Sequence, residues 1–313
     1  MTRGRSIATA AARRLLAAVA VLFGAATLAF AALELIPGDP VETLLGPATT
    51  ASPAVRRQIA VEYGFNRPVL VQYLDFIGRL LRGDLGQSYQ LERPVSSLIT
   101  GQLGPTAQLA GAAIVLAVLA ALFSAVATAG RRPALRAAAI AGELLAVSIP
   151  TYWSGILLLT AFSFQLRIFP VAGDQGLAAL VLPAVTLALP VAGVLGQVLR
   201  EGLEAALAEP FVVTARARGL SQTAVRLRHA LRHAAVPLLT LTGWLTGTLF
   251  GGAVLVETVF GRPGIGTLTL QAVSSKDMPL VTGIVLLSAA VFVAISMLLD
   301  LLYLAIDPRL RTS

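Results

Sequence analysis

Residues 106–128 read TAQLAGAAIVLAVLAALFSAVAT, an uninterrupted stretch without a charged side chain. The hydrocarbon core of a bilayer is about 30 Å thick and an α-helix rises about 1.5 Å per residue, so about 20 consecutive apolar residues are needed to cross it. This stretch is long enough, and its small and aliphatic residues are typical of helices that pack against one another in lipid. We therefore predict a transmembrane helix here.

The rest of the chain has the same character. Hydrophobic residues make up 56% of the sequence and charged residues only 13%, whereas soluble domains carry about 25% charged residues. With so little charge, a soluble fold would be unable to cover its surface with polar groups, so the apolar excess must face lipid. The sequence predicts an all-α integral membrane fold with six transmembrane helices, at residues 15–35, 106–128, 137–160, 177–199, 236–256 and 280–304.

The positions of the basic residues predict how these helices are oriented. Short cytoplasmic loops of membrane proteins carry an excess of Lys and Arg. Fifteen arginines lie before the first span, after the sixth, and in the loops that follow the second and fourth spans. Because an even number of spans places both termini on one side, we expect both termini in the cytoplasm.

This orientation divides the chain into parts with different surroundings. We expect a cytoplasmic N-terminus at 1–14, a first span at 15–35, an external interfacial subdomain at 36–105, a transmembrane core at 106–304 that contains a cytoplasmic loop at 200–235, and a cytoplasmic C-terminus at 305–313.

The first span allows a second interpretation. Its basic start, its apolar run and Ala29-Phe30-Ala31 resemble a secretory signal peptide with a cleavage site. The apolar run is longer than the usual core of about 7–15 residues, which favours a helix that is retained.

Composition and missing motifs exclude other classes of protein. The net charge is +8, but no basic stretch has interleaved aromatic residues, so nucleic-acid binding is not indicated. The sequence has no cysteine, which excludes disulfides, thiolate metal sites and cysteine nucleophiles. It also has no Gly-x-x-x-x-Gly-Lys-Ser/Thr loop. The chain therefore does not bind ATP in the P-loop manner, and ATP-driven transport would need another subunit.

The external segment contains a helix with one apolar face. Its apolar residues recur at spacings of three and four, the helical pattern. A helix lying along the membrane interface explains this pattern, and so does a platform that meets a partner outside the membrane. The apolar residues are Leu70, Tyr73, Leu74, Ile77, Leu80 and Leu81.

The cytoplasmic loop at 200–235 has the pattern of two short helices around a break. The first helix would end near Arg218, with Gly219 at the position after the C-cap, where a left-handed backbone is easiest without a Cβ. The Ser221 hydroxyl would then cap the next helix. An exposed helix–Gly–helix elbow is suited to docking in a groove of a partner. A basic amphipathic helix resting on anionic lipid is the alternative.

In the second helix of this loop, an apolar stripe at about 100° per residue separates apolar from charged side chains. The stripe comprises Ala224, Leu227, Ala230, Leu231 and Ala234, and the residues predicted on the other faces are Arg226, Arg228, His229, Arg232 and His233.

The residues of this loop resemble the EAA loop of the dipeptide/oligopeptide/nickel ABC importer permeases. The resemblance covers nearly the whole chain, with weak motifs that are specific together because they occur in the expected order. The matching residues are Pro37-Gly38-Asp39-Pro40, Arg67-Pro68, Tyr73-Leu74, Arg82-Gly83-Asp84-Leu85-Gly86, Ser148-Ile149-Pro150 with Trp153, Phe211 through Ser221, Arg228 through Ala234 with Pro237, Val259 through Gly266, and Asp307-Pro308-Arg309.

The resemblance implies the type I ABC importer fold, in the plasma membrane of a bacterium, and a role in the uptake of peptides. It implies no catalysis and no cofactor of the chain's own, because partner subunits bind the ATP. The implied partners are a second homologous permease subunit, two ATP-binding subunits and an extracytoplasmic solute-binding protein. Because selectivity resides largely in that binding protein, nickel, haem and glutathione stay open as substrates.

In that family the loop forms a coupling helix seated on the ATPase. The resemblance therefore implies ATPase coupling for Thr214, Ala215, Arg216, Arg218, Gly219, Leu220, Ser221, Arg228, His229 and Arg232. This sequence departs from the general motif, since Val213-Thr214-Ala215 stands where Glu-Ala-Ala is usual and His233 replaces a common Asn. These departures affect the detailed contacts.

Two other classes of function are weaker alternatives. An ion-coupled carrier needs ionisable groups deep in the membrane, and Glu143 is the one acid well inside an apolar run. It lies near Arg136, and a structural pairing explains it more simply. A metal site at His229 and His233 has the right spacing on a helix but lacks a third ligand.

Overall fold

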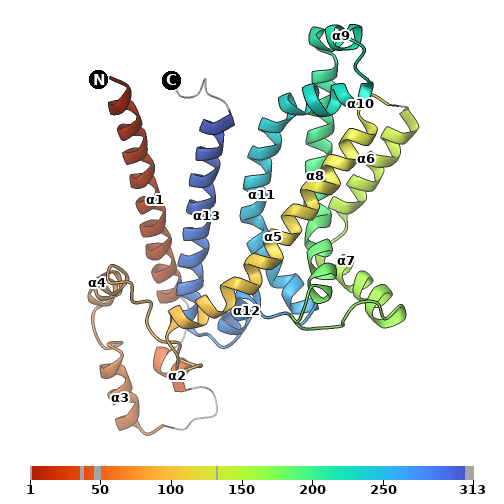
Figure 1. Cartoon of the computed structure of the whole chain (residues 1–313). Coiled ribbons are helices and arrows are strands. Elements are labelled where there is room, and N and C mark those ends of the chain that lie inside the picture. The colour runs from red at the N-terminus through yellow and green to blue at the C-terminus, as the bar shows by residue number, and fades with distance from the viewer. Residues whose placement is uncertain (1, 36–38, 46–50, 132, 307–313) are drawn as a thin grey trace. The chain divides into compact units, whose positions relative to one another are not determined.

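The computed structural model describes residues 2–35, 39–45, 51–131 and 133–306. These residues form helices and turns without a strand, so the all-α prediction is confirmed (Figure 1). The helices are α1 (Thr2–Glu34), α2 (Pro40–Leu45), α3 (Pro53–Glu62), α4 (Val69–Leu80), α5 (Val95–Thr128), α6 (Pro133–Ser148), α7 (Thr151–Leu158), α8 (Ala178–Leu207), α9 (Pro210–Ala217), α10 (Gln222–Val225), α11 (Leu231–Val259), α12 (Ile265–Ser274) and α13 (Met278–Ile306), with π-helical segments η1 (Leu159–Gln165) and η2 (Arg226–Ala230).

The described helices include the predicted spans. Four of them, within α1, α5, α8 and α13, are long and apolar enough to cross a membrane alone. Two bent pairs, α6 with α7 and η1, and the two parts of α11, raise the number to six if each pair is counted as one span. The motifs at 37–38 and 307–309 lie outside the described residues.

The third predicted span, 137–160, is a bent pair rather than one continuous helix. α6 and the segment from α7 to η1 meet at 103°, and the break falls at Ile149-Pro150. The residue before a proline is disfavoured in the helical conformation, and Pro150 has no N–H to continue the ladder. The apolar run is continuous, but the chain turns at this proline.

The chain divides into two compact units, residues 1–103 with 267–293 and residues 104–266 with 294–313. The first unit contains the external segment. The second contains most of α5, all of α6 to α11, and the elbow loop. The sequence predicts residues 267–293 as part of the transmembrane core. In the structure they belong to the same compact unit as the external segment.

In the first unit, α4 packs against the first predicted span. The Phe30 ring lies 5.3 Å from the ring of Tyr73 and 5.6 Å from that of Phe76, centroid to centroid. The Tyr73 hydroxyl also lies 2.9 Å from that of Thr27. The predicted helix is therefore confirmed, but only part of its apolar face is covered, because Leu70 and Leu74 are 68% and 60% exposed.

The buried carboxylate of Asp277, which was not predicted as a functional group from the sequence, holds the turn before α5. Asp277 is 1% exposed, and its carboxylate accepts hydrogen bonds from the Ser88 hydroxyl and from the backbone N–H groups of Tyr89 and Gln90. It also accepts the N–H of Leu280 in the first turn of α13. One side chain thus ties a loop to a helix N-terminus nearly 190 residues away.

The core of the second unit is built on small residues. Ala113, Ala117 and Ala121 recur every four residues along α5, and each is at most 1% exposed. They pack in one cluster with Leu195 of α8 and Leu249 of α11. Small side chains let helices approach closely in lipid, where packing replaces the hydrophobic effect as the main source of association.

Candidate functional site

Helix α9 ends in a Schellman turn centred on Gly219. The backbone of Gly219 has φ +80°, its N–H donates to the Arg216 carbonyl at 2.9 Å, and the Leu220 N–H donates to the Ala215 carbonyl at 3.3 Å. These are the two hydrogen bonds that define the motif. A Cβ at Gly219 would meet nothing within 4 Å, so the need for glycine is conformational and not steric. The predicted helix end is confirmed.

Ser221 begins the next helix, as predicted. Its hydroxyl oxygen accepts the N–H of Ala224 at 3.2 Å, which is the capping bond expected of a serine before the first helical turn. From there α10, η2 and α11 follow one another without a break. The elbow is thus defined by one capped helix end and one capped helix start.

A small hydrophobic cluster fixes the angle of the elbow. Val212 and Ala215 of α9 and Val225 of α10 are buried together, and the partly buried side chains packed against them are Leu207, Phe211 and Leu220. The Leu220–Ala215 side of this cluster is the apolar contact that usually accompanies a Schellman turn. We call these six residues the elbow cluster. It packs α9 against the end of α8 and against α10.

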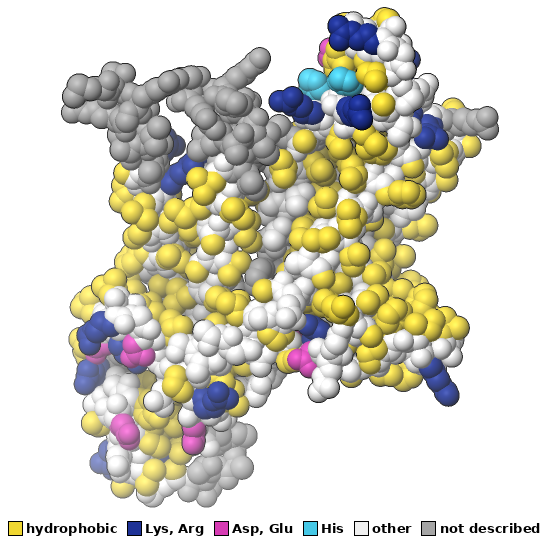
Figure 2. Space-filling view, viewed as in Figure 1, with side chains coloured by type: hydrophobic (Ala, Val, Ile, Leu, Met, Phe, Trp, Pro, Cys, Tyr) yellow, Lys and Arg dark blue, Asp and Glu magenta, His cyan; other side chains and the backbone are white. Residues whose placement is uncertain are grey.

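The opposite face of α9 is open. Val213 is 72% exposed, and Thr214 and Arg218 are exposed beside it. Basic and histidine side chains gather at this end of the second unit, above a surface that is mainly hydrophobic (Figure 2). Of the predicted coupling residues, Ala215 is buried and Leu220 half-buried, while Thr214, Arg216, Arg218, Gly219, Ser221, Arg228, His229 and Arg232 are exposed.

The predicted faces of the second loop helix are wrong at two positions. Arg226, expected on the polar side, is 2% exposed, whereas Leu227, expected in the apolar stripe, is 47% exposed. The cause is η2, a π-helical turn from Arg226 to Ala230. A π-turn adds a residue to the helical turn and shifts the faces relative to a regular α-helix. Ala230 and Ala234 are buried as predicted.

Helices extend into the predicted loop from both sides, because α8 continues to Leu207 and α11 starts at Leu231. Arg200, expected in the loop, is a buried residue of α8. Its guanidinium pairs with the Glu143 carboxylate of α6 through both terminal nitrogens, one at 2.8 Å, and donates to the Thr128 hydroxyl at 2.8 Å. The expected neighbour of Glu143, Arg136, instead pairs with Glu204 at 2.9 Å.

Another buried acid, Glu257, holds the Val259–Gly266 motif. Glu257 is 0% exposed and accepts a hydrogen bond from the Thr106 hydroxyl at 2.6 Å, whose oxygen in turn accepts the Ile265 N–H at 2.8 Å. The carboxylate occupies the space where a Cβ on Gly264 would lie. These contacts join α5, α11 and the start of α12, so Glu257 has a structural role, as Glu143 has through its pair with Arg200.

The two histidines pack beside an aromatic residue. The His233 ring stacks on Phe211 at 5.0 Å and the His229 ring lies 6.5 Å from it, between centroids. Among the described residues, no group of three or more His, Cys, Asp or Glu side chains is arranged to hold a metal ion. Through these ring contacts with Phe211, the histidines also hold α9 against η2 and the start of α11.

Comparisons with known proteins support the architecture described above. Residues 113–312 match the family described as binding-protein-dependent transport system inner membrane component. A Brucella abortus (strain 2308) protein named as a peptide transport system permease is 36% identical over 308 residues, which cover 96% of this chain and 98% of that protein. The glutathione transport system permease protein GsiC of Salmonella typhimurium is 35% identical over 304 residues, covering 96% and 97%.

Two solved structures share the fold. A crystal structure of an amino acid ABC transporter with histidines aligns with a TM-score of 0.52 at 18% identity, covering 66% of this chain and 93% of that one. An inward-facing structure of the MetNI methionine ABC transporter aligns with a TM-score of 0.54 at 18% identity, covering 67% and 96%.

Proposed function

The chain belongs to the family of binding-protein-dependent transport system inner membrane components, and from that premise we propose that it is the permease subunit of an importer for short peptides. It is a multi-pass membrane protein of an ABC importer and not an enzyme, because ATPase subunits hydrolyse the ATP and a binding protein delivers the solute. The substrate class rests on relatives named as peptide permeases. Glutathione, itself a tripeptide, is the second candidate, since a permease named for it is equally similar.

The coupling role is supported by the arrangement of α9 at the elbow, which is packed on one face and exposed on the other. A helix that transmits force between subunits must be fixed on one face and free on the other. The elbow cluster fixes Val212 and Ala215 of α9, while Val213 protrudes with Thr214 and Arg218 beside it. We infer that α9 seats in a groove of the ATPase with Val213 at the contact, in the mode of a helix laid in a groove.

The remaining partners and the orientation belong to the same proposal. The chain pairs with a second, homologous permease to enclose the pathway, and two ATPases bind on the cytoplasmic side, where both termini also lie. Closure of the ATPases on ATP moves the two elbows together and tilts the spans, and hydrolysis resets them. This is a rigid-body switch, which requires stiff docking more than chemistry at the elbow.

Growth on peptides tests the function directly. A strain lacking this gene and auxotrophic for an amino acid should fail to grow when a dipeptide or tripeptide is the sole source of that amino acid, and the wild-type gene should restore growth. Growth on the free amino acid is the control for general fitness. Undiminished growth on every peptide tried, together with lost growth on glutathione as the sole sulfur source, would move the assignment to glutathione.

Charge reversal tests the docking face. Arg228 and Arg232 are both exposed, and we expect Arg228→Glu with Arg232→Glu to reduce copurification of the ATPase with tagged permease by about threefold to tenfold, because rim charge pairs each contribute up to about 1 kcal/mol. Arg57→Glu, an equally exposed reversal on α3, serves as the control and should leave capture unchanged. Full capture by the double variant would assign this basic face to lipid instead.

A further inference from the structure

Arg226 presents a buried positive charge with little compensation. It is 2% exposed, and its Nε is buried without a hydrogen-bond acceptor among the described residues. Within the described part of the chain, its polar contact is a long hydrogen bond to the Gln222 side chain, 3.5 Å between Nη2 and Oε1. A buried guanidinium is costly unless an anion or several acceptors surround it. No described residue therefore supplies the anionic partner that the burial of Arg226 requires.

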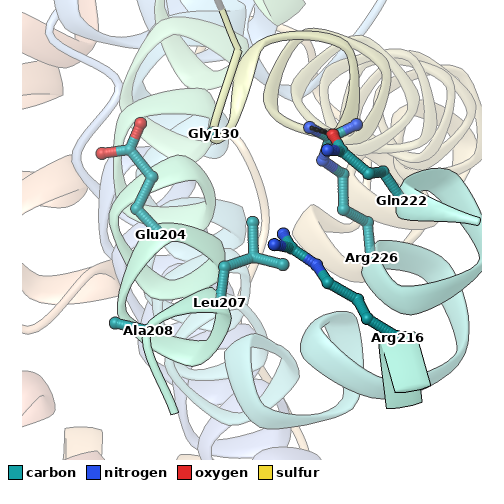
Figure 3. A pocket seen from close by; sticks show the side chains of 7 residues that line it. All are labelled: Gly130, Glu204, Leu207, Ala208, Arg216, Gln222 and Arg226. Carbon is teal, nitrogen blue, oxygen red and sulfur yellow. Dashed lines mark hydrogen bonds between the residues drawn. The ribbon is translucent and has the colours of Figure 1, made fainter. Parts of the chain in front are cut away.

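The guanidinium borders a cavity at the elbow. This cavity of about 290 Å³ is lined by Gly130, Glu204, Leu207, Ala208, Arg216, Gln222 and Arg226. Figure 3 shows Arg216 and Arg226 extending toward the space beside Leu207 and Gly130, with Glu204 turned away from both guanidinium groups. Gly130 lies beside this guanidinium, since a Cβ built on Gly130 would be in van der Waals contact with Arg226 Nη2 at 3.8 Å.

The charges around the cavity are predominantly positive. Burial and the nearby charges of Arg131 and Arg216 lower the pKa of Arg226 from its usual value. The single acid in the lining, Glu204, is already paired with Arg136 at 2.9 Å. A second cavity of about 680 Å³ shares Gly130, Gln222 and Arg226 and adds Arg131 and Leu135 to the lining. Arg226 thus borders both cavities, with Arg216 on the first and Arg131 on the second, and an anion beside Arg226 would neutralise this positive charge.

The position of the site indicates what the anion is. Gly130 and Arg131 lie between α5 and α6, and because the apolar stretch 106–128 ends just before them, we place them at the level of the lipid headgroups. The lining combines arginines with Leu207 and with Leu135, which is 48% exposed. A phosphate beside an apolar chain fits this combination, and basic pockets between transmembrane helices bind headgroups in this way. A free inorganic anion has no apolar part that would contact Leu207 and Leu135.

We propose that the cavity bordered by Gly130, Arg216 and Arg226 binds the phosphate of an anionic phospholipid headgroup. The Arg226 guanidinium donates to the phosphate oxygens from within the protein, and Arg216 approaches them from α9. Because α9 carries the elbow and η2 continues into α11, the bound headgroup joins the coupling loop to the membrane surface. This site is independent of the transported solute and does not rest on the peptide assignment.

Lipid binding to the purified full chain tests the proposal. The chain in neutral detergent is titrated with dioleoylphosphatidylglycerol, and native mass spectrometry gives the Kd of the first bound lipid. Arg226→Gln should weaken this binding about tenfold, the effect of losing a charge-assisted hydrogen bond. Arg216→Gln changes an exposed residue and should weaken it several-fold. Arg228→Gln, which removes an exposed charge from the same segment, should leave it unchanged.

Several outcomes would overturn the proposal. Equal affinity of the wild type and both lining variants would remove the site, and an equal loss in Arg228→Gln would assign the effect to the basic surface as a whole. Displacement of the lipid by millimolar inorganic phosphate is expected, but binding of inorganic phosphate without any binding of the lipid would leave a free-anion site only. Unchanged lipid binding with lost ATPase capture in Arg226→Gln would give the cavity to an acidic side chain of the ATPase.

Discussion

Arg200→Met alone is expected to lower the free energy of unfolding by about 3–5 kcal/mol, because it leaves the Glu143 carboxylate charged and buried without its partner. Arg200 and Glu143 are 2% and 8% exposed, and the pair is completed by the hydroxyls of Ser124 and Thr128. The carboxylate lies directly against α8, where a Cβ at Gly196 would come within 2.6 Å of its oxygen, so it is enclosed by that helix. Thermal unfolding of the chain in detergent should show a midpoint lower by roughly 5–10 °C.

A matched control uses the exposed ion pair between the same two helices. Arg136→Met removes the partner of Glu204 in a pair whose side chains are 48% and 27% exposed, and such pairs contribute less than about 1 kcal/mol. Adding Glu143→Gln to Arg200→Met should recover part of the loss, because no uncompensated charge is then buried. If Arg136→Met and Arg200→Met lowered the midpoint equally, the buried pair would have no special role in stability.

The sequence predicted the fold class well because long apolar runs require a membrane helix whatever their neighbours are. It did not predict the bend in the third span. Hydropathy measures how apolar a stretch is and contains no information on the direction of the helix axis. The run at 137–160 is therefore continuous in hydropathy although α6 and α7 meet at 103°. Ile149-Pro150 was the available signal, since a proline and its preceding residue interrupt helices. Proline alone does not decide the matter, because Pro105, Pro183, Pro190 and Pro237 lie inside helices.

At the candidate site, local features were predicted and distant ones were not. The turn at Gly219 and the cap at Ser221 depend on a few adjacent residues, so residue type and spacing define them. Glu143 and Arg200 are 57 residues apart, and no periodicity connects them. Arg226 was misplaced because a regular period of 3.6 residues does not describe a π-turn. Its burial, and with it the cavity, became visible only in the structure.

Gly219→Val is expected to abolish most transport while leaving the subunit in the membrane. A β-branched residue at φ +80° costs about 1–3 kcal/mol, which favours a different backbone at the elbow over the Schellman turn. No neighbour lies within 4 Å of the added Cβ, so core packing is untouched and the spans should fold normally. Gly219→Asn is the matched variant, because Asn tolerates the left-handed conformation better than other non-glycine residues.

The measurement separates assembly from coupling. In the full transporter reconstituted in liposomes, Gly219→Val should reduce solute uptake about tenfold or more while ATP hydrolysis continues, since a shift of 1.4 kcal/mol changes the population of a conformation about tenfold. Gly219→Asn should retain most of the uptake, and both variants should reach the membrane in wild-type amounts. Normal uptake by the Val variant would show that the elbow geometry does not transmit the motion. Equal losses in Val and Asn would point to the side chain meeting the ATPase rather than to the backbone, because only the backbone argument ranks Asn above Val.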